Sequence, residues 1–249
     1  MSQELFSAVS GASAAWSQLD IVSHNLANVG TVGYKARQTT FQLSEGANNN
    51  AVLGQAYVEP GESPIDHSNG ALQLTDNPLD IAIQGRGFFT VATPDGEQFL
   101  TRNGSFQLDT EGYVSTMAGD RLQTTAGPIL LQQGQRLEIG DDARVTIMND
   151  VDGTESEIGW LQILDGEVEP VGATMFKAVG PMEELAQYQM QPGEAPPMQI
   201  RQRHLEKSNV DPLGAMVELI EASRYIEAYR KMMQASDEAD SRLVQTGRT

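Results

Sequence analysis

The 249-residue chain contains no cysteine. Disulfide bonds, thiolate nucleophiles and cysteine-ligated metal sites are therefore excluded. The sequence also lacks an apolar run approaching the roughly 20 residues that a membrane-spanning helix needs. Its N-terminus has no basic segment followed by an apolar one, so we expect no Sec-type signal peptide. The protein is then expected to be cytoplasmic, or exported by a route that reads no such signal.

Basic residues are scarce, because 16 Lys and Arg stand against 34 Asp and Glu, for a formal net charge of −18. This acidic excess argues against nucleic acid or an anionic membrane surface as the main partner. Hydrophobic residues make up 39% and charged residues 20%, which is typical of a globular chain rather than a disordered one. The length is sufficient for one large domain or two small ones.

Signatures of enzyme chemistry are incomplete. The three histidines lie in three different segments, with no second histidine at helical spacing: His24, His67 and His204. No G-x-S-x-G sequence occurs. The stretch 85–87, Gly-Arg-Gly, begins a dinucleotide fingerprint, but Thr90 occupies the third glycine position and a strand rather than a helix is predicted to follow.

A calcium loop is the one metal site that the sequence suggests, at residues 149–159. With Gly153 at the turn position of such a loop, Met148 and Gly159 would occupy positions that require acidic ligands. A hairpin turn is the better interpretation. We therefore predict no catalytic residue, no bound metal and no cofactor.

The first thirty residues are predicted to form a helix, because apolar residues recur at three- and four-residue steps. The apolar positions are Leu5, Val9, Ala12, Trp16, Leu19 and Leu26. Residues 7–15 are nearly all small, and only Glu4 and Asp20 are formally charged before Tyr34. Such a helix is expected to be buried on several sides, against its own chain or against copies of it. It should end near residues 28–30, where Asn and Gly favour a C-cap.

A second, longer helix is predicted at the C-terminus. Asp211 is a suitable N-cap and Pro212 suits the first helical position. The apolar stripe that follows contains Leu213, Met216, Leu219, Ile220, Ile226, Tyr229, Met233 and Leu243. Its length suggests a coiled-coil-like partner. Since neither stripe is a strict heptad, we expect packing among many helices rather than an isolated two-stranded coil.

The middle of the chain differs in composition. Residues 31–78 are rich in Gly, Asn, Ser and Pro, and are predicted to be an extended connector. From 79 to 206, short apolar runs alternate with turn dipeptides, which predicts a β-rich domain of the sandwich or barrel type. Its predicted core residues are Phe88, Phe89, Val91, Phe99, Phe106, Leu108, Tyr113, Trp160, Leu161 and Ile163.

The predicted fold class is therefore α+β, and mainly β. The terminal segments 1–30 and 210–249 would pair as a discontinuous, coiled-coil-like core domain. The β-rich domain 79–206 would be inserted between them through the connector 31–78.

Four stretches, in this order along the chain, resemble the signatures of bacterial flagellar axial proteins, the rod and hook family. They are NLANVGTVGYK (25–35), NPLDIAIQGRGFFTV (77–91), TRNGSFQLDTEGYV (101–114) and LEKSNVDPLGAMVELIEASRYIEAYRKM (205–232). Together they span nearly the whole chain. The length and the opening sequence look most like the proximal-rod type, with the distal-rod type as the alternative. The family signal is thin over residues 181–199, whose fold is left open.

The resemblance implies a structural subunit of the basal-body rod, the drive shaft that crosses the periplasm and transmits torque. Its partners would be further copies, other flagellar rod proteins and the flagellar type III export apparatus, with no nucleic acid and no membrane insertion. The terminal segments of such subunits are expected to be largely disordered when free and to become helices on assembly. No enzymatic activity is expected.

The residues expected to mediate self-assembly lie in the two terminal segments. They are Val9, Ala12, Trp16, Leu19, Asn25, Leu26, Asn28, Gly33, Ser208, Asn209, Val210, Leu213, Met216, Ile220 and Ile226. For Asn25 and Asn28 two interpretations stay open: a local helix cap or turn, and amides that bridge neighbouring helices and fix their register. Gly30 and Gly33 are expected to serve the turn into the connector.

Two functions of other classes are weighed against this one. The first is a binding module or adhesin, in which the β-rich domain holds a ligand and the helices are multimerising tails. The second is a hydrolase that uses a pair of acidic residues. A specific ligand for residues 79–206, or turnover by them, would favour these alternatives.

Overall fold

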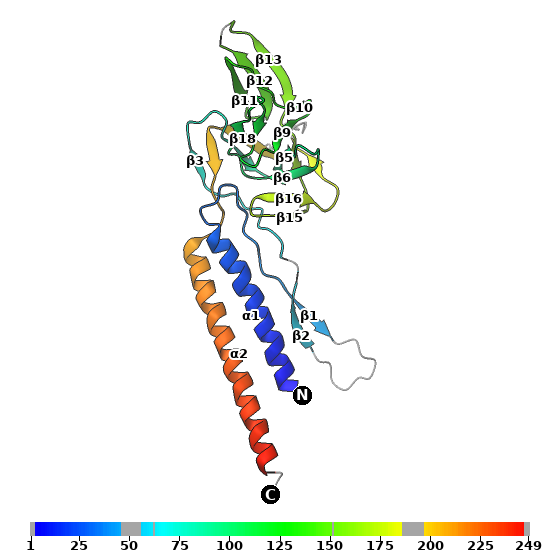
Figure 1. Cartoon of the computed structure of the whole chain (residues 1–249), viewed down its shortest axis with the longest axis vertical. Coiled ribbons are helices and arrows are strands. Elements are labelled where there is room, and N and C mark those ends of the chain that lie inside the picture. The colour runs from blue at the N-terminus through cyan, green and yellow to red at the C-terminus, as the bar shows by residue number, and fades with distance from the viewer. Residues whose placement is uncertain (1–2, 46–55, 62, 151, 186–196, 247–249) are drawn as a thin grey trace. The chain divides into compact units, whose positions relative to one another are not determined.

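A computed structural model provides the fold of the chain, and it describes residues 3–45, 56–61, 63–150, 152–185 and 197–246 (Figure 1). The described residues form a mainly β structure, with helix α1 (Gln3–Ala27) at the start of the sequence and helix α2 (Pro212–Thr246) at its end. Parts of the predicted connector (46–55) and of the segment 181–199 (186–196) lie outside the described residues. Within the described part, neither helix is long and apolar enough to cross a membrane.

The strands pair in antiparallel fashion and form several sheets rather than one. The largest sheet has the order β15 (Val168–Pro170), β16 (Met175–Ala178), β6 (Gln98–Thr101), β5 (Phe88–Ala92), β9 (Arg121–Thr124), β8 (Val114–Ser115), β7 (Gln107–Leu108). Off this path, β10 (Gly127–Pro128) pairs with β9, and β14 (Ile163–Asp165) pairs with β5 and with β17 (Glu183–Glu184).

The remaining strands form smaller sheets. One has the order β11 (Gln135–Ile139), β12 (Arg144–Asn149), β13 (Glu155–Trp160). The two-stranded sheets are β18 (Met198–Gln202) with β4 (Ile81–Gly85), β19 (His204–Glu206) with β3 (Leu72–Leu74), and β1 (Phe41–Glu45) with β2 (Ala56–Pro60).

The chain divides into two compact units. The helical unit comprises Met1–Ala27, Ala36–Asp66 and Val210–Thr249, and the β unit comprises Asn28–Lys35 and His67–Asn209. The chain therefore passes from one unit to the other at four points, after residues 27, 35, 66 and 209.

The β unit has its own hydrophobic core. Six of the predicted core residues are almost completely buried: Phe88, Phe89, Val91, Phe106, Leu161 and Ile163. Aromatic contacts reinforce this core, because the rings of Phe89 and Phe106 meet edge to face with centroids 5.8 Å apart. The prediction was wrong for Leu108, which is exposed, because it lies in the two-residue strand β7 at the end of the largest sheet.

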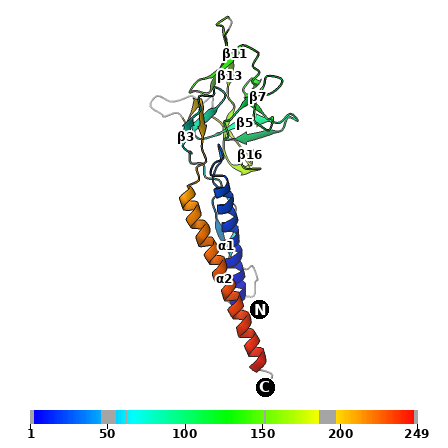
Figure 2. The ribbon, with the colours of Figure 1, turned by 60° about the vertical axis from the view of Figure 1, so that its left-hand side comes forward.

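The helical unit is held together by close packing of α1 and α2, which lie side by side (Figures 1 and 2). Gly11 of α1 lies directly against the ring of Tyr229 in α2, at a distance that a side chain would not allow. α1 ends at Ala27, slightly earlier than predicted, and a turn from Asn28 to Thr31 follows. α2 begins as predicted, since both side-chain oxygens of Asp211 accept backbone N–H groups of the first turn.

An antiparallel ribbon completes the helical unit. β1 and β2 pair in register, and the pairing continues beyond them through the N–H of Gln38 to the carbonyl of Pro64 and the N–H of Asp66 to the carbonyl of Ala36. The side chain of Asn25 in α1 binds both backbone groups of Arg37, accepting its N–H and donating to its carbonyl, each at 2.9 Å. Asn25 thus fastens α1 to the ribbon.

Candidate assembly site

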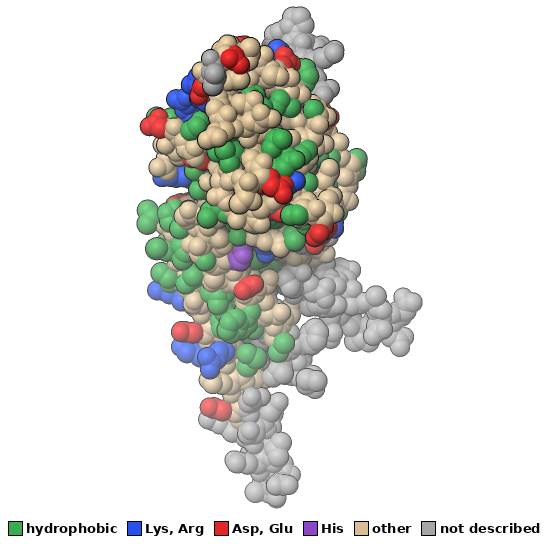
Figure 3. Space-filling model, turned by 45° about the horizontal axis from the view of Figure 1, so that its top comes forward, with side chains coloured by type: hydrophobic (Ala, Val, Ile, Leu, Met, Phe, Trp, Pro, Cys, Tyr) green, Lys and Arg blue, Asp and Glu red, His purple; other side chains and the backbone are tan. Residues whose placement is uncertain are grey.

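The first turns of α2 carry apolar side chains on two opposite faces. Ala215, Ala222 and Ile226 are buried. With 100° per residue, the side chains on the opposite face cluster within about a third of the circumference. These exposed side chains are Leu213 (74% exposed), Met216 (50%), Val217 (55%) and Ile220 (52%). Charged residues take over this outer face beyond Glu221, so the apolar patch is confined to the start of the helix. Figure 3 shows hydrophobic side chains gathered on the outside of the molecule between polar ones.

α1 also exposes two large apolar side chains. Its buried side chains include Ala14, Ala15 and Ile21, whereas Val9 and Trp16 are exposed, Trp16 to 58%. Because these two are seven residues apart, they lie on the same side of the helix, away from Ala14 and Ile21. The polar residues Ser13 and Asp20 are exposed on that side as well.

The helical unit also has an open pocket at its surface. Its volume is about 220 Å³, and its lining consists of Gly11, Ala14, Ala15, Gln18, Phe41, Tyr225 and Tyr229. Most of these residues are small or aromatic, so the pocket is largely apolar.

The other predicted assembly residues of the helices are less accessible. Ala12 and Ile226 are buried within the chain, and Leu19, Leu26 and Val210 are intermediate. Of the predicted set, the exposed apolar residues of the two helices are therefore Val9, Trp16, Leu213, Met216 and Ile220. Ala12 and Ile226 already pack against other parts of the same chain.

The polar members of the predicted set have partners within the chain. Asn28 accepts a hydrogen bond from the hydroxyl of Thr31 at 3.1 Å, a local turn contact. Asn209 donates to the backbone carbonyl and the hydroxyl of Ser68, at 3.2 and 3.1 Å. Ser208 is half-buried next to it. Gly33 is buried with a φ of +68°, a conformation that favours glycine, whereas Gly30 does not adopt it.

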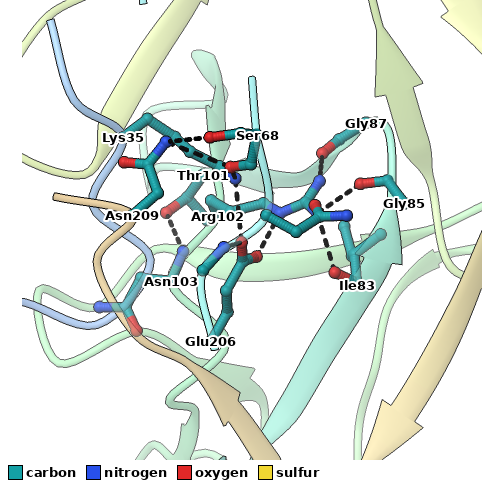
Figure 4. A network of polar contacts seen from close by, with 12 residues as sticks. Lys35, Ser68, Ile83, Gly85, Gly87, Thr101, Arg102, Asn103, Glu206 and Asn209 are labelled. Atoms are coloured by element: carbon teal, nitrogen blue, oxygen red, sulfur yellow. Dashed lines mark hydrogen bonds and ion pairs between the residues drawn. The ribbon is translucent and has the colours of Figure 1, made fainter. Parts of the chain in front are cut away.

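A buried ionic cluster that the sequence did not reveal lies in the β unit, around Glu206. One carboxylate oxygen of Glu206 binds Nζ of Lys35 at 2.9 Å, and the other binds Nε of Arg102 at 2.6 Å. The three side chains are only 1–2% exposed. We call these three residues the Glu206 cluster; Figure 4 shows them with their neighbours.

Backbone carbonyls stabilise the extra positive charge of the cluster. The guanidinium of Arg102 donates to the carbonyls of Ile83 at 2.8 Å and Gly85 at 2.6 Å, and also to that of Gly87. Nζ of Lys35 donates to the carbonyl of Ser68 at 2.7 Å. Two cations thus share one carboxylate, and partial negative charge from these carbonyls offsets the second cation.

Lys35, Arg102 and Glu206 come from three distant parts of the sequence, with Lys35 and Glu206 separated by 171 residues. The only local hint was that Lys35 ends a segment with very few charges. Within the described residues, no group of three or more acidic, histidine or cysteine side chains is arranged to hold a metal ion.

Three segments of the chain match known sequence families. Residues 5–35 match flagella basal body rod proteins, residues 82–154 match the D1 domain of flagellar hook proteins FlgE/F/G, and residues 201–246 match the C-terminal region of flagellar basal body rod FlgEFG proteins. Flagellar basal-body rod protein FlgG of Bacillus subtilis is 32% identical over 268 residues, which cover 98% of each chain. The chain belongs to the flagellar basal-body rod family.

Relatives in this rod family carry two names. Flagellar basal-body rod protein FlgG of Caulobacter vibrioides is 28% identical and covers 95% of this chain, and 96% of its own length is matched. Flagellar basal-body rod protein FlgF of Salmonella typhimurium is also 28% identical, over 98% of both chains. The protein is thus a structural subunit of the rod in the flagellar basal body, and the comparisons are consistent with a place in the proximal rod.

The three matched segments meet in the Glu206 cluster. Lys35 is the last residue of the first match, Arg102 lies in the second and Glu206 in the third. The family signatures that are far apart in this sequence therefore supply one buried site of the β unit.

Proposed function

We propose that this rod subunit assembles with further copies and other rod proteins through its terminal helices. The observation that carries this proposal is the apolar outer face at the start of α2, opposite the side chains that α2 buries within the chain. Val9 and Trp16 of α1 are exposed as well. In the proposal the segments 1–30 and 210–249 form a discontinuous, coiled-coil-like assembly domain. The segment 31–78 is the connector, and 79–206 is the inserted β-rich domain.

The proposed assembly residues are those predicted from the sequence, and the exposed apolar ones would contribute most. Burying an apolar side chain such as Leu213 or Ile220 contributes about 1.5–3 kcal/mol relative to leaving it exposed. Ordering the terminal segments costs roughly 1–2 kcal/mol of backbone entropy per residue. Only contacts with several neighbours would offset that cost, so helix formation and assembly are expected to be coupled.

Helical symmetry suits this arrangement. Copies that contact one another through different patches, head to tail, extend as a filament instead of closing into a dimer. The subunit would leave the cell unfolded through the flagellar type III export apparatus, without a cleavable signal peptide, and take its place in the proximal rod. Torque would be transmitted by many small contacts, with no active site.

Substitution of Ile220 by Asp tests the proposal. A charge in the centre of the α2 patch should prevent rod assembly and abolish swimming, while the β unit stays folded. Gln234→Asp is the matched control, because it places the same side chain at an exposed position of α2 outside the patch. Swimming scored on soft agar, with rods imaged by electron cryotomography, checks the outcome. Normal rods in the Ile220→Asp strain would contradict assembly through this face.

Asn28→Asp separates the two interpretations of that residue. An Asp side chain keeps an acceptor for the hydroxyl of Thr31, so a purely local role predicts little change. A bridging role needs the amide donor, and the substitution would then stop assembly. We expect the second outcome; if rods form normally, Asn28 acts only in the turn.

A further inference from the structure

Three of the four points at which the chain passes between the two units, those after residues 35, 66 and 209, have one feature in common. Lys35 directly precedes one passage, and Ser68, Asn69 and Gly70 directly follow another. Glu206 and Asn209 precede the last one. Each of these three passages is therefore within a few residues of the Glu206 cluster or of a group that is hydrogen-bonded to it.

The contacts confirm that these segments are tied to one another and not only to the β-unit core. One carboxylate oxygen of Glu206 accepts both Nζ of Lys35 and the N–H of Gly70, at 2.9 and 2.8 Å. The carbonyl of Glu206 accepts the N–H of Gly33 at 2.8 Å, which also secures the segment that follows α1. Asn209 donates to Ser68 (Figure 4), and Arg102 donates to the side chain of Asn69 at 2.8 Å.

The connecting segments also approach one another closely through their backbones, which supports the same conclusion. A Cβ atom added to Gly70 would overlap the carbonyl oxygen of Lys207, and one added to Gly33 would overlap the backbone of Arg102 and Asn103. The connecting segments are thus packed directly on each other and on the strand end that carries Arg102. Such contacts leave little freedom for one segment to move without the others.

We propose that the Glu206 cluster is a latch that carries the mechanical force passed along the chain between the helical unit and the β unit. The inference rests on the rod function, since only a torque-transmitting subunit meets such a force. A pull on α2 reaches the β unit first at Asn209 and Glu206, and a pull on the ribbon reaches it first at Lys35 and Ser68. In both cases the force passes within a few residues to the buried ion pairs that Glu206 makes with Lys35 and Arg102.

A buried ion pair suits this role better than an apolar contact. If the ion pair separates, its charges are left unpaired in a site that excludes water, so even partial separation is strongly unfavourable. Glu206 is the central member, because it bonds both cations and two backbone N–H groups at once. Glu206→Gln keeps the shape but removes the charge that binds Lys35 and Arg102.

Hydrogen exchange on the full-length protein, read by mass spectrometry, tests whether the segments are coupled. Glu206→Gln should raise exchange at least about tenfold in 28–35, 67–71 and 204–209 together, beyond any change in β5. The matched variant is Ile147→Ala, a buried core change in β12 that touches none of these segments. Ile147→Ala should raise hydrogen exchange in β5 and in the connecting segments by similar factors. The proposal would be overturned if the two variants had identical exchange patterns, or if exchange rose only around residue 206.

Force spectroscopy on single chains tests whether the cluster carries force. The absence of cysteine allows two attachment points to be introduced, Asp95→Cys in the β unit and Gln234→Cys in α2, both at exposed positions. Glu206→Gln should lower the rupture force for this pair by more than Ile147→Ala does. When force is instead applied between Asp95→Cys and Asp152→Cys, both in the β unit, Glu206→Gln should lower the rupture force no more than Ile147→Ala does. Equal losses in both geometries would refute the proposal but leave rod assembly intact, because single chains do not assemble.

Discussion

Glu206 shows how strongly a single buried charge depends on its neighbours. With Lys35 and Arg102, it forms a site of two cations and one carboxylate. Glu206→Gln leaves two buried cations without an anion, so we expect a loss of about 3–5 kcal/mol in the free energy of unfolding. Lys35→Met leaves the Arg102 pair intact and electrically balanced, and should cost clearly less. Urea unfolding followed by fluorescence of Trp160, which lies in the β unit, measures both.

The exposed pair of Lys177 and Glu97, at 3.1 Å, provides a control for these charge changes. Lys177→Met should change stability by about 0–1 kcal/mol, since exposed pairs contribute little. If Lys35→Met proves as damaging as Glu206→Gln, then charge balance is not what stabilises the cluster.

Gly33 provides a second prediction at the residue scale. Its φ of +68° disfavours any other residue, and a Cβ atom would overlap backbone atoms that cannot move aside. Gly33→Ala should therefore destabilise the β unit by more than about 2 kcal/mol. Gly30→Ala meets no atom within 4 Å and should stay within about 0.5 kcal/mol of the wild type. Thermal unfolding of the two variants tests this prediction. Similar melting temperatures for Gly33→Ala and Gly30→Ala would contradict the steric argument.

At the scale of elements, the start of α2 depends on Asp211. Its side chain accepts the N–H groups of Leu213 and Gly214, both at 3.1 Å. Asp211→Ala should cost about 1 kcal/mol, because those N–H groups lose their partner, whereas Asn keeps the capping ability. Far-UV circular dichroism on heating should show earlier loss of helix in Asp211→Ala and little change in Asp211→Asn. Equal losses in both would indicate that charge, rather than the hydrogen bonds, is responsible.

The helices and most of the β core could be predicted from the sequence because their signals are local. The apolar periodicity located both helices, and the Asp211-Pro212 pair located the start of α2. The Glu206 cluster could not be predicted, since nothing near Lys35 indicates a partner 171 residues away. The contact of Asn25 could not be predicted for the same reason, because its partner is the backbone of Arg37, in a ribbon whose pairing depends on the tertiary fold.

At the scale of the whole molecule, the two units differ in how complete they are. Among the residues whose burial the structure describes, the twelve largest fully buried side chains all belong to the β unit, including Tyr34, Phe88 and Ile200. Among the described residues of the helical unit, the buried apolar side chains are mostly alanines. A core of that kind stabilises a helix pair only weakly, and an isolated helix is marginal in water. The β unit is therefore expected to fold as a free subunit, with the helical unit completed by its neighbours.

The two tryptophans of the chain allow this difference to be measured, because Trp16 lies in α1 and Trp160 in β13. In a Trp160→Phe variant, Trp16 should be readily quenched by acrylamide in the dilute subunit, as its exposure implies. On assembly at high concentration, verified by sedimentation, its emission should shift to the blue and the quenching should fall. In the reciprocal Trp16→Phe variant, Trp160 should change little, because the β unit is already complete. If Trp16 stays equally quenched in sedimenting assemblies, the outer face of α1 is not buried by neighbours, and α2 alone would have to supply the contacts between subunits.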